Sequence, residues 1–448
     1  MVGISPAITQ MKTEFERARR WRRGRREPLQ FGDLRCEALD RFLSLGFPTL
    51  QDDEWRFTNV APIAEKIFTL ALQSASDARY LSLTPLRLPD DFGTELIFVN
   101  GHILTEASTC RGLPLGARVE SLSQILDSSS PDVISHLARV APFERRAFVA
   151  LNTALFADGA CVLIPAHTVV EKPIHVRFIS TGEADMRPAM SNARVLVVLQ
   201  DGSQATIVES YVGPKGVQYF TNAVTEIVLG ENAVLDHYKL QCESVEAYHT
   251  SATNVVAASG ANCSRHHISL GGALVRDDVV AVLGGEGVKY TVNGLYLVDG
   301  ERLVDNHTTI DHVMQRCRSR QTYNGILADR ARSVFDSKIV VRADAHQLDA
   351  KQTNRTLRLS DDARSDSTSH LENLANEVHC IQRAVGRKID EAAALYIRSR
   401  GLRDAEARRL VMLAFVRDIV NRLPFRPLAG GVEELLERQL EGMLGSLA

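Results

Sequence analysis

The chain has 448 residues, of which 45% are hydrophobic and 24% are charged, and its formal net charge is −3. This length allows two or three domains with a large buried core, and the balance of residues excludes a wholly disordered protein. The small net charge, the lack of an apolar run of roughly 18 residues and the lack of a secretory signal predict a cytoplasmic protein with no nucleic-acid or membrane partner.

Residues 1–142 are predicted to form a mainly helical N-terminal region. Its first part carries a basic run, Arg17–Arg26, which includes Trp21. Such a run is typical either of a phosphate-binding arm or transit segment, or of a solvated and partly frayed helix. We favour the helix because Glu14 and Glu16 lie beside the basic residues, and transit segments are poor in acids.

The next signals are a hairpin and a helix. Leu96–Leu104 predicts a β-hairpin, because Asn100-Gly101 supplies the positive φ angles that a tight two-residue turn requires. Phe143–Asp158 predicts a helix, with Phe148, Leu151 and Leu155 on one apolar face.

Residues 143–375 are predicted to form a β core, because almost all of Gly159–Ser360 has the composition and turn signals of short strands. The pattern alone leaves two architectures open: an antiparallel meander or sandwich, and a solenoid of short parallel strands. Dipeptides such as Asp201-Gly202 favour hairpins slightly. The sequence also shows no clear repeat, which is the signal that would favour a solenoid.

The densest group of polar residues in this core lies within Gly294–Ala363. Turns are predicted at Asn293-Gly294, Asp299-Gly300 and Asn324-Gly325. Strand alternation separates six polar side chains between two faces, with Asp305, His307, Thr309 and Asp311 on one face and Asn306 and His312 on the other. Imidazole and carboxylate groups can bind a transition metal, but a hydrogen-bonded polar rim of the β core explains these residues better.

Residues 376–448 are predicted to form a C-terminal helical region. Asp390 is a good N-cap for its first helix, Gly401 ends that helix, and Asp404 is predicted to cap the next one. An apolar stripe at helical spacing follows, through Met412, Phe415, Val416, Ile419 and Leu423.

Motifs of several enzyme classes are absent from the sequence. It contains no G-x-x-x-x-G-K-[ST] nucleotide loop, no G-x-G-x-x-G, no H-E-x-x-H and no G-x-S-x-G. Its seven cysteines are too far apart for the close pairs of a zinc site, and the chain alone is poorly suited to hold a four-thiolate cluster. No catalytic residue is therefore assigned, and no metal ligand is identified.

Several segments resemble one protein family in their residues and their order. They are Asp53–Asn59 (DEWRFTN), Leu151-Asn152 with Asp158-Gly159, His237–Gln241 (HYKLQ), Gln352–Asn354 (QTN) and Tyr396–Leu402 (YIRSRGL). Together they are similar to the SufB/SufD family of iron–sulfur cluster assembly, and to its SufD branch more than to its SufB branch. The resemblance implies a mainly β fold with helical flanks, in which a right-handed parallel β-helix core is capped by N-terminal and C-terminal helical regions.

The same resemblance implies a function and partners. The chain would be a non-catalytic scaffold subunit that pairs with SufB and docks SufC, the subunit in which ATPase activity resides. An iron–sulfur cluster would be held transiently at the SufB–SufD interface. The resemblance assigns the SufC contact to Arg398, Arg400 and Gly401, with Phe415 on the following helix. A flavin in the complex and a homodimer of the isolated chain are left open.

Cys380 is the candidate for the cluster site under this resemblance. In the family, a histidine implicated in cluster assembly stands two residues after this cysteine, whereas this chain has Gln382. Glutamine cannot take up a proton near neutral pH and is a poor metal ligand. Cys380 therefore either contacts a cluster or is a buried structural thiol.

Two alternatives to the scaffold function remain open. A polysaccharide-acting β-helix enzyme would use Asp, Arg and His side chains on extended strands for acid–base chemistry. The chain would otherwise be a SufB paralogue, or a degenerate SufD that retains only its partner contacts.

Overall fold

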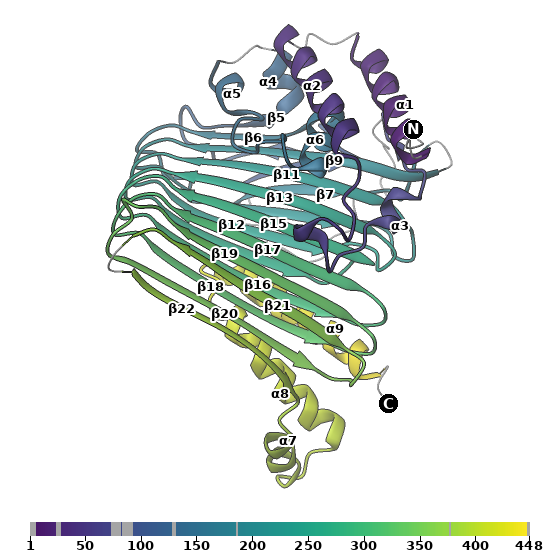
Figure 1. Ribbon diagram of the computed structural model, residues 1–448, viewed down its shortest axis with the longest axis vertical. Helices are drawn as coiled ribbons and strands as arrows, with labels where there is room; N and C mark the ends of the chain where they lie inside the picture. The colour runs from purple at the N-terminus through teal and green to yellow at the C-terminus, as the bar shows by residue number, and fades with distance from the viewer. Residues whose placement is uncertain are drawn as a thin grey trace.

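The computed structural model describes residues 6–23, 28–72, 82, 93–127, 131–184, 187–375 and 378–445. Its core is a parallel β-solenoid, flanked by helices from both ends of the chain, which confirms the expected fold class (Figure 1). Arg25 and Arg26 of the basic run lie outside the described residues.

Two eleven-stranded sheets, here named sheet A and sheet B, form the walls of the solenoid. Sheet A contains β1 (Thr69–Leu70), β5 (Arg118–Ser121), β6 (Gly159–Ile164), β8 (Glu183–Ala184), β9 (Arg187–Leu199), β11 (Phe220–Leu229), β13 (Tyr248–Ala257), β15 (Leu274–Leu283), β17 (Leu303–His312), β19 (Arg332–Val341) and β21 (Arg364–Asn373). Sheet B contains β2 (Thr94–Val99), β3 (His102–Ile103), β4 (Thr109–Cys110), β7 (Ile174–Ile179), β10 (Gln204–Val212), β12 (Val234–Cys242), β14 (Asn262–Ser269), β16 (Lys289–Val298), β18 (Arg318–Leu327), β20 (Leu348–Arg358) and β22 (Val378–Lys388).

The strands from β9 onward alternate between the two sheets, so two consecutive strands make one coil. Each strand bonds in parallel to the strand one coil further along the chain, as His237 of β12 shows by lying between Ile207 of β10 and Arg265 of β14. A parallel pair requires a long crossover between its strands, and here the intervening strand of the other sheet provides it. The antiparallel alternative is therefore wrong for this part of the core.

The turns that lead into the strands of sheet B form a regular ladder. One residue per coil has a positive φ angle, at intervals of 27 to 31 residues: Gly202, Asn232, Gly260, Gly287, Arg316 and Gln347. The backbone N–H of Gly202 donates to the carbonyl of Glu231 (2.7 Å), and that of Gly260 donates to the carbonyl of Glu286 (2.8 Å). Asp201-Gly202 therefore belongs to a solenoid corner and not to a hairpin.

Two of the dipeptides that predicted turns lie inside strands instead. Gly294 is in the middle of β16 and Gly325 is in the middle of β18, and only Asp299-Gly300 of the three forms a turn. A Cβ at Gly294 would lie 2.1 Å from the ring of Tyr323, and a Cβ at Gly325 would lie 2.0 Å from the ring of Tyr296. These glycines are present because neighbouring tyrosine rings cover them.

Helices from the first third of the chain gather mostly at one end of the solenoid, and the short helix Asp53–Trp55 among them lies instead over its middle strands (Figure 1). They are α1 (Pro6–Arg22), α2 (Leu29–Leu45), the short η1 (Asp53–Trp55), α3 (Ala61–Ala64), α4 (Leu122–Asp127), α5 (Pro131–His136) and α6 (Ala147–Leu155). The helix expected at the basic run is α1, but one of its faces is buried by Met11, Phe15 and Ala18, so it is not simply solvated. The hairpin at Asn100-Gly101 is confirmed, with φ angles of 51° and 82°.

The last helices pack on the outer face of sheet B. They are α7 (Glu391–Arg398), α8 (Asp404–Val420) and α9 (Arg426–Gly445). The apolar stripe of α8 packs on the sheet of this same chain: Met412, Val416 and Ile419 are buried in one cluster with Leu295 of β16. Asp390 caps α7 by accepting from the N–H groups of Ala392 and Ala393 (both 3.1 Å).

Two details of the C-terminal region differ from expectation. Asp404 is the first residue of α8, and its N-cap is Arg403, so the predicted cap is wrong by one position. The β core also continues past residue 375, because β22 runs to Lys388 before the helices begin. Among the helices that the structure describes, none is both long enough and apolar enough to cross a bilayer.

Candidate functional site

The two ends of the solenoid differ in how their strands are covered. In the described part of the chain, β21 bonds only to β19 and β22 bonds only to β20, so both last strands leave their outward edges unpaired. Two large apolar side chains are exposed at this edge, Leu371 (45%) in β21 and Leu374 (70%) just after it. We call this surface of β21 and β22 the open end.

Cys380 lies at the open end, in β22. Cys380 pairs with Ala350 of β20, and the strand continues beyond it to Lys388. Its side chain is half-buried against an apolar cluster that includes Ile339 and Leu348. This burial raises the pKa of the Cys380 thiol, so the thiol is protonated at neutral pH.

Gln382 lies on the same face of β22 as Cys380, two residues further on. It pairs with Gln352, and its side-chain amide donates to the carbonyl of His370 in β21 (3.3 Å). His379 is exposed and points to the other face of the strand, as alternation predicts. Neither residue is therefore placed to act as a base for the Cys380 thiol.

The predicted SufC contacts divide between the tip and the base of a helical hairpin. Arg398 forms an ion pair with Asp404 (3.2 Å), and Arg400 donates to the hydroxyl of Tyr396 (2.8 Å). Gly401 has a φ of +95° and lies in the turn between α7 and α8, at the tip of the hairpin. These residues lie at the part of α7 that projects from the body of the protein (Figure 1).

Phe415 lies at the base of that hairpin, away from its tip. Its side chain is half-buried against the apolar cluster between α8 and sheet B, and its carbonyl accepts from the side chain of Asn324 (2.9 Å). Phe415 therefore holds α8 on the sheet. Exposed apolar residues at the tip were not singled out from the sequence, namely Leu395, Tyr396, Leu402 and Leu410.

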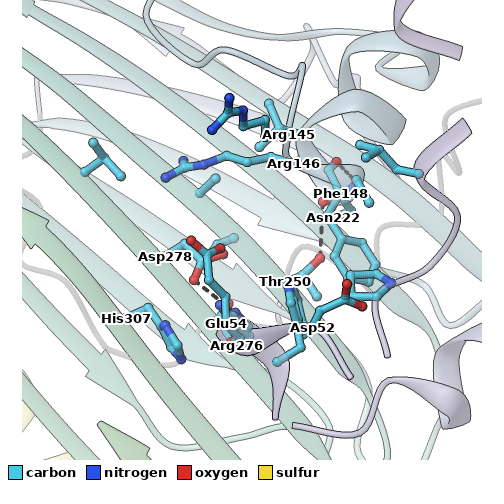
Figure 2. A pocket seen from close by; sticks show the side chains of 18 of the residues that line it. Asp52, Glu54, Arg145, Arg146, Phe148, Asn222, Thr250, Arg276, Asp278 and His307 are labelled. Atoms are coloured by element: carbon cyan, nitrogen blue, oxygen red, sulfur yellow. Dashed lines mark hydrogen bonds and ion pairs between the residues drawn. The ribbon is translucent and has the colours of Figure 1, made fainter. Parts of the chain in front are cut away.

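A groove of about 420 Å³ lies on the outer face of sheet A. Arg145 and Arg146, which precede α6, form one side, and Arg276, Asp278 and His307 form the other (Figure 2). Arg146 donates to the side chain of buried Asn254 (3.1 Å). Cations and carboxylates both line this groove, so its charge does not select one class of ligand.

The family-like segment Asp53–Asn59 is held beside this groove by a buried ionic group. The Arg276 guanidinium lies 3.7 Å from the ring centroid of Trp55, and it contacts Asp305 (2.7 Å). Asp305 also contacts His307 (2.9 Å) and accepts from Thr58 (2.5 Å). Trp55 therefore packs on the β core, and the polar-rim interpretation of Asp305 and His307 is confirmed.

The pKa shifts of this group follow from its charges. Burial raises the pKa of the Asp305 carboxyl, but the positive charges of Arg276 and His307 and the hydrogen bonds from His307 and Thr58 together outweigh burial, and the pKa lies below its usual range. For His307, burial lowers the pKa, but the charge and hydrogen bond of Asp305 and the charge of Asp278 together outweigh it, and the pKa lies above its usual value. The pair is an ionic clamp between the N-terminal segment and β17.

The interior of the middle coils holds further charged residues. His237 contacts Glu209 (2.9 Å), and His249 contacts Glu243 (2.6 Å), all without exposure. Asp277 is nearby and binds Lys239, Arg265 and His267. These ionisable groups have their partners within the solenoid, which indicates a structural role. In the described ranges, no group of three or more His, Cys, Asp and Glu side chains is arranged to hold a metal ion.

The architecture thus defines a class of protein: a parallel β-solenoid with one capped end and one open end. Residues 178–415 match the family model described as SUF system FeS cluster assembly, SufBD core domain. Residues 24–176 match the SufBD protein N-terminal region. The chain belongs to the SufB/SufD family of iron–sulfur cluster assembly proteins.

Individual relatives agree with this assignment. The chain is 30% identical to the iron–sulfur cluster assembly SufBD family protein slr0076 of Synechocystis, over 89% of this chain and 88% of the relative. It is 26% identical to the iron–sulfur cluster assembly protein SufD of Escherichia coli, over 86% and 87%. It is also 27% identical to the chloroplastic protein ABCI7 of Arabidopsis thaliana, over 89% and 83%. These matches favour an assembly protein over a polysaccharide-acting enzyme.

Proposed function

We propose that this chain is a SufD-type scaffold subunit that pairs with SufB and docks the SufC ATPase. The observation that carries the proposal is the open end, where two strands of 10 and 11 residues leave their outward edges unpaired. An unpaired edge is a template for a strand of another chain, and the exposed Leu371 and Leu374 add apolar surface beside it.

The SufC docking surface is proposed at the tip of the α7–α8 hairpin. Leu395 (63% exposed) and Tyr396 (61% exposed) combine there with Arg398 and Arg400. Apolar and aromatic residues with arginine are the usual composition of a binding hot spot. Phe415 supports this surface indirectly, by fixing α8 to sheet B.

The iron–sulfur cluster is proposed as cargo held at the interface with SufB. Cys380 supports this because it lies in the last strand, beside the edge at which SufB would pair. Its thiol is protonated in the isolated chain, and Gln382 cannot accept the proton. SufB would therefore have to supply the group that deprotonates Cys380.

Co-expression with SufB and SufC, followed by affinity purification on this chain, tests the proposal. Leu371→Glu should lose SufB and keep SufC, because it adds a charge to the open end only. Arg400→Glu should lose SufC and keep SufB. Arg330→Glu is the matched control, because Arg330 is 70% exposed at a solenoid corner away from both surfaces. Failure to recover either partner with the unaltered chain would refute the assignment.

A second test separates a cluster-site subunit from a degenerate subunit that keeps only partner contacts. Cys380→Ser in the assembled complex should lower the yield of cluster, and Gln382→His should raise it by placing a base beside the thiol. An unchanged yield in both variants would show that Cys380 is a structural thiol and that only the partner contacts matter.

A further inference from the structure

A second pocket lies on the outer face of sheet B, beside the connection between α8 and α9. Its volume is about 390 Å³. The strand register places two rows of side chains across β14, β16, β18 and β20 on its floor and rim: Ser264, Thr291, Arg320 and Lys351 in one row, and His266, Asn293, Thr322 and Thr353 in the next. Arg355, Arg422 and Pro424 close one side.

The rim of this pocket is cationic. Arg320, Lys351, Arg355 and Arg422 line it, and no carboxylate among the described residues does so. Asp349 pairs with Arg320 from outside the pocket, and Asp418 pairs with both Arg355 (2.9 Å) and Arg422 (3.2 Å). Asp236 of β12 also lies beside the pocket, where it accepts from Ser264. Three carboxylates thus face four cations, which leaves a small excess of positive charge although the whole chain is slightly acidic.

The floor of the pocket supplies a buried hydrogen-bond donor. His266 is 2% exposed, and its ring stacks on Tyr238 with centroids 4.8 Å apart. The side-chain amide of Asn293 donates to Nδ1 of His266 (3.2 Å), which leaves the ring proton on Nε2. Within the described part of the chain, His266 Nε2 is buried and has no hydrogen-bond partner. Buried donors are normally satisfied by a protein group, a water or a ligand, and this donor belongs to a residue that lines a cationic pocket, so an acceptor oxygen in the pocket could satisfy it.

We propose that this pocket binds the phosphate or pyrophosphate group of a small molecule. His266 Nε2 and the hydroxyls of Thr291 and Thr322 would donate to the oxygens at the floor, while Lys351 and Arg320 would contact them from the rim. Oxyanions with several acceptor oxygens match this set, because charge-assisted bonds from lysine and arginine are strong and the remaining oxygens need neutral donors. The site lies on β14, β16, β18 and β20, and β20 is directly beside β22 of the open end.

A small anion fits this pocket better than an acidic segment of a partner protein. The essential donor, His266 Nε2, lies at the floor behind the rim residues, and a carboxylate side chain on a backbone would have to enter beside Arg422 and Pro424 to reach it. The rim cations alone would suit either ligand. The His266 contact therefore distinguishes the two.

Isothermal titration calorimetry on the isolated full chain tests the site with inorganic phosphate, pyrophosphate and ADP. Lys351→Gln should weaken binding about tenfold by removing one charge-assisted contact. His266→Phe should weaken it by a similar factor, because it keeps the ring on Tyr238 and removes the Nε2 donor. Thermal unfolding checks that the second variant is folded. Tighter binding of ADP than of pyrophosphate would identify a phosphorylated metabolite, and equal binding would identify the inorganic anion.

Lys215→Gln is the matched control, because Lys215 is exposed in the loop between β10 and β11 and makes the same change of charge elsewhere. It should bind all three anions as the unaltered chain does. The proposal is overturned if none of the anions binds at millimolar concentration, or if Lys215→Gln loses as much affinity as Lys351→Gln. It is also overturned if folded His266→Phe binds normally, or if an oligoglutamate peptide binds more tightly than every phosphate probe.

Discussion

The two ends of the solenoid differ in how their outermost coils are covered and in what fills the interior there. At the N-terminal end, helices cover the first coils, and apolar side chains such as Val162, Val176 and Val195 pack in the interior. At the open end, the two sheets are joined across the interior by polar contacts, among them Gln352 with Ser369 (2.8 Å). A dry core can be capped permanently, whereas a polar last coil is compatible with water or a partner.

Charged residues along β21 limit which strands can pair with the open end. Asp366 and Glu372 lie on β21, and each forms an ion pair with a residue of β19, Arg332 (3.7 Å) and Lys338 (2.7 Å) respectively. Charges along an edge strand oppose indiscriminate pairing with other strands. The edge can therefore pair with a strand whose charges are complementary to its own, while the same charges oppose aggregation with other strands.

The capped end depends on a buried ion pair, and its removal should have the largest effect. Glu226 accepts from Arg194 and from the backbone N–H groups of Ala138, Val140 and Ala141 (2.9 to 3.0 Å). Glu226→Ala would leave Arg194 charged and buried, with three amide groups unsatisfied. We expect it to lower the free energy of unfolding by about 3–5 kcal/mol, measured by urea denaturation.

The control for Glu226→Ala is Glu301→Ala. Glu301 and Arg330 form an ion pair in which both side chains are 70% exposed, and such pairs contribute about 0–1 kcal/mol. If both variants lost the same small amount, the capped end would not be held by its buried charges.

The second prediction compares two glycines that occupy aligned positions in different coils of the solenoid. Strand pairing aligns Gly325 with Thr356 and Thr356 with Gly386 at the open end. Gly325→Ala would force its Cβ into the ring of Tyr296, and we expect a loss of about 1–3 kcal/mol in urea denaturation. Gly386→Ala meets no atom within 4 Å and should be neutral or stabilising by up to about 1 kcal/mol. Equal losses at the two positions would mean that the last coil is packed as tightly as the middle ones.

These glycines also show what the sequence alone could not reveal. Asn293-Gly294 and Asn324-Gly325 have the composition of turns, but their function depends on Tyr323 and Tyr296, which lie one coil away in space. Local propensity cannot report such a contact. The hairpin at Asn100-Gly101 was predicted correctly because all of its determinants are local.

The sequence shows no clear repeat for the coils of the solenoid, for a similar reason. The corner residue with positive φ recurs once per coil, but Gly202, Asn232, Arg316 and Gln347 fill it with different residue types. The backbone bond to the next coil maintains the corner, so no single side chain has to repeat. Only the resemblance to a family made the β-helix predictable.

The candidate site was predictable in part. Cys380 and the hairpin tip were identified through family-like motifs, and Asp390 through its local capping signal. The pocket around His266 was not, because its rows come from four strands in successive coils and the register that aligns them appears only in the fold.

The third prediction compares two His–Asp pairs on the outer face of sheet A. His307 pairs with Asp305 under the N-terminal segment, whereas His370 lies 3.6 Å from Asp336 at the open end and is 51% exposed. Because the pKa of His307 is raised in the folded protein, its protonation stabilises the fold below the unfolded value of about 6.5. That stability is lost as the pH rises through the folded pKa.

His307→Gln should therefore remove part of the decline in the free energy of unfolding above pH 6.5, measured by urea denaturation between pH 6 and pH 9. The removed slope cannot exceed about 1.4 kcal/mol per pH unit, because a single proton is involved. Arg276, Asp278 and Asp305 also face His307. Arg276 and Asp305 keep their charges across this range, because the pKa of the guanidinium is raised and that of the Asp305 carboxyl is lowered. His370→Gln should leave the profile nearly unchanged, because its partner is more distant and solvent screens the pair. If both variants altered the profile equally, the His307–Asp305 pair would be no stronger than the exposed His370–Asp336 pair. The N-terminal segment would then not strengthen the ion pair that it covers.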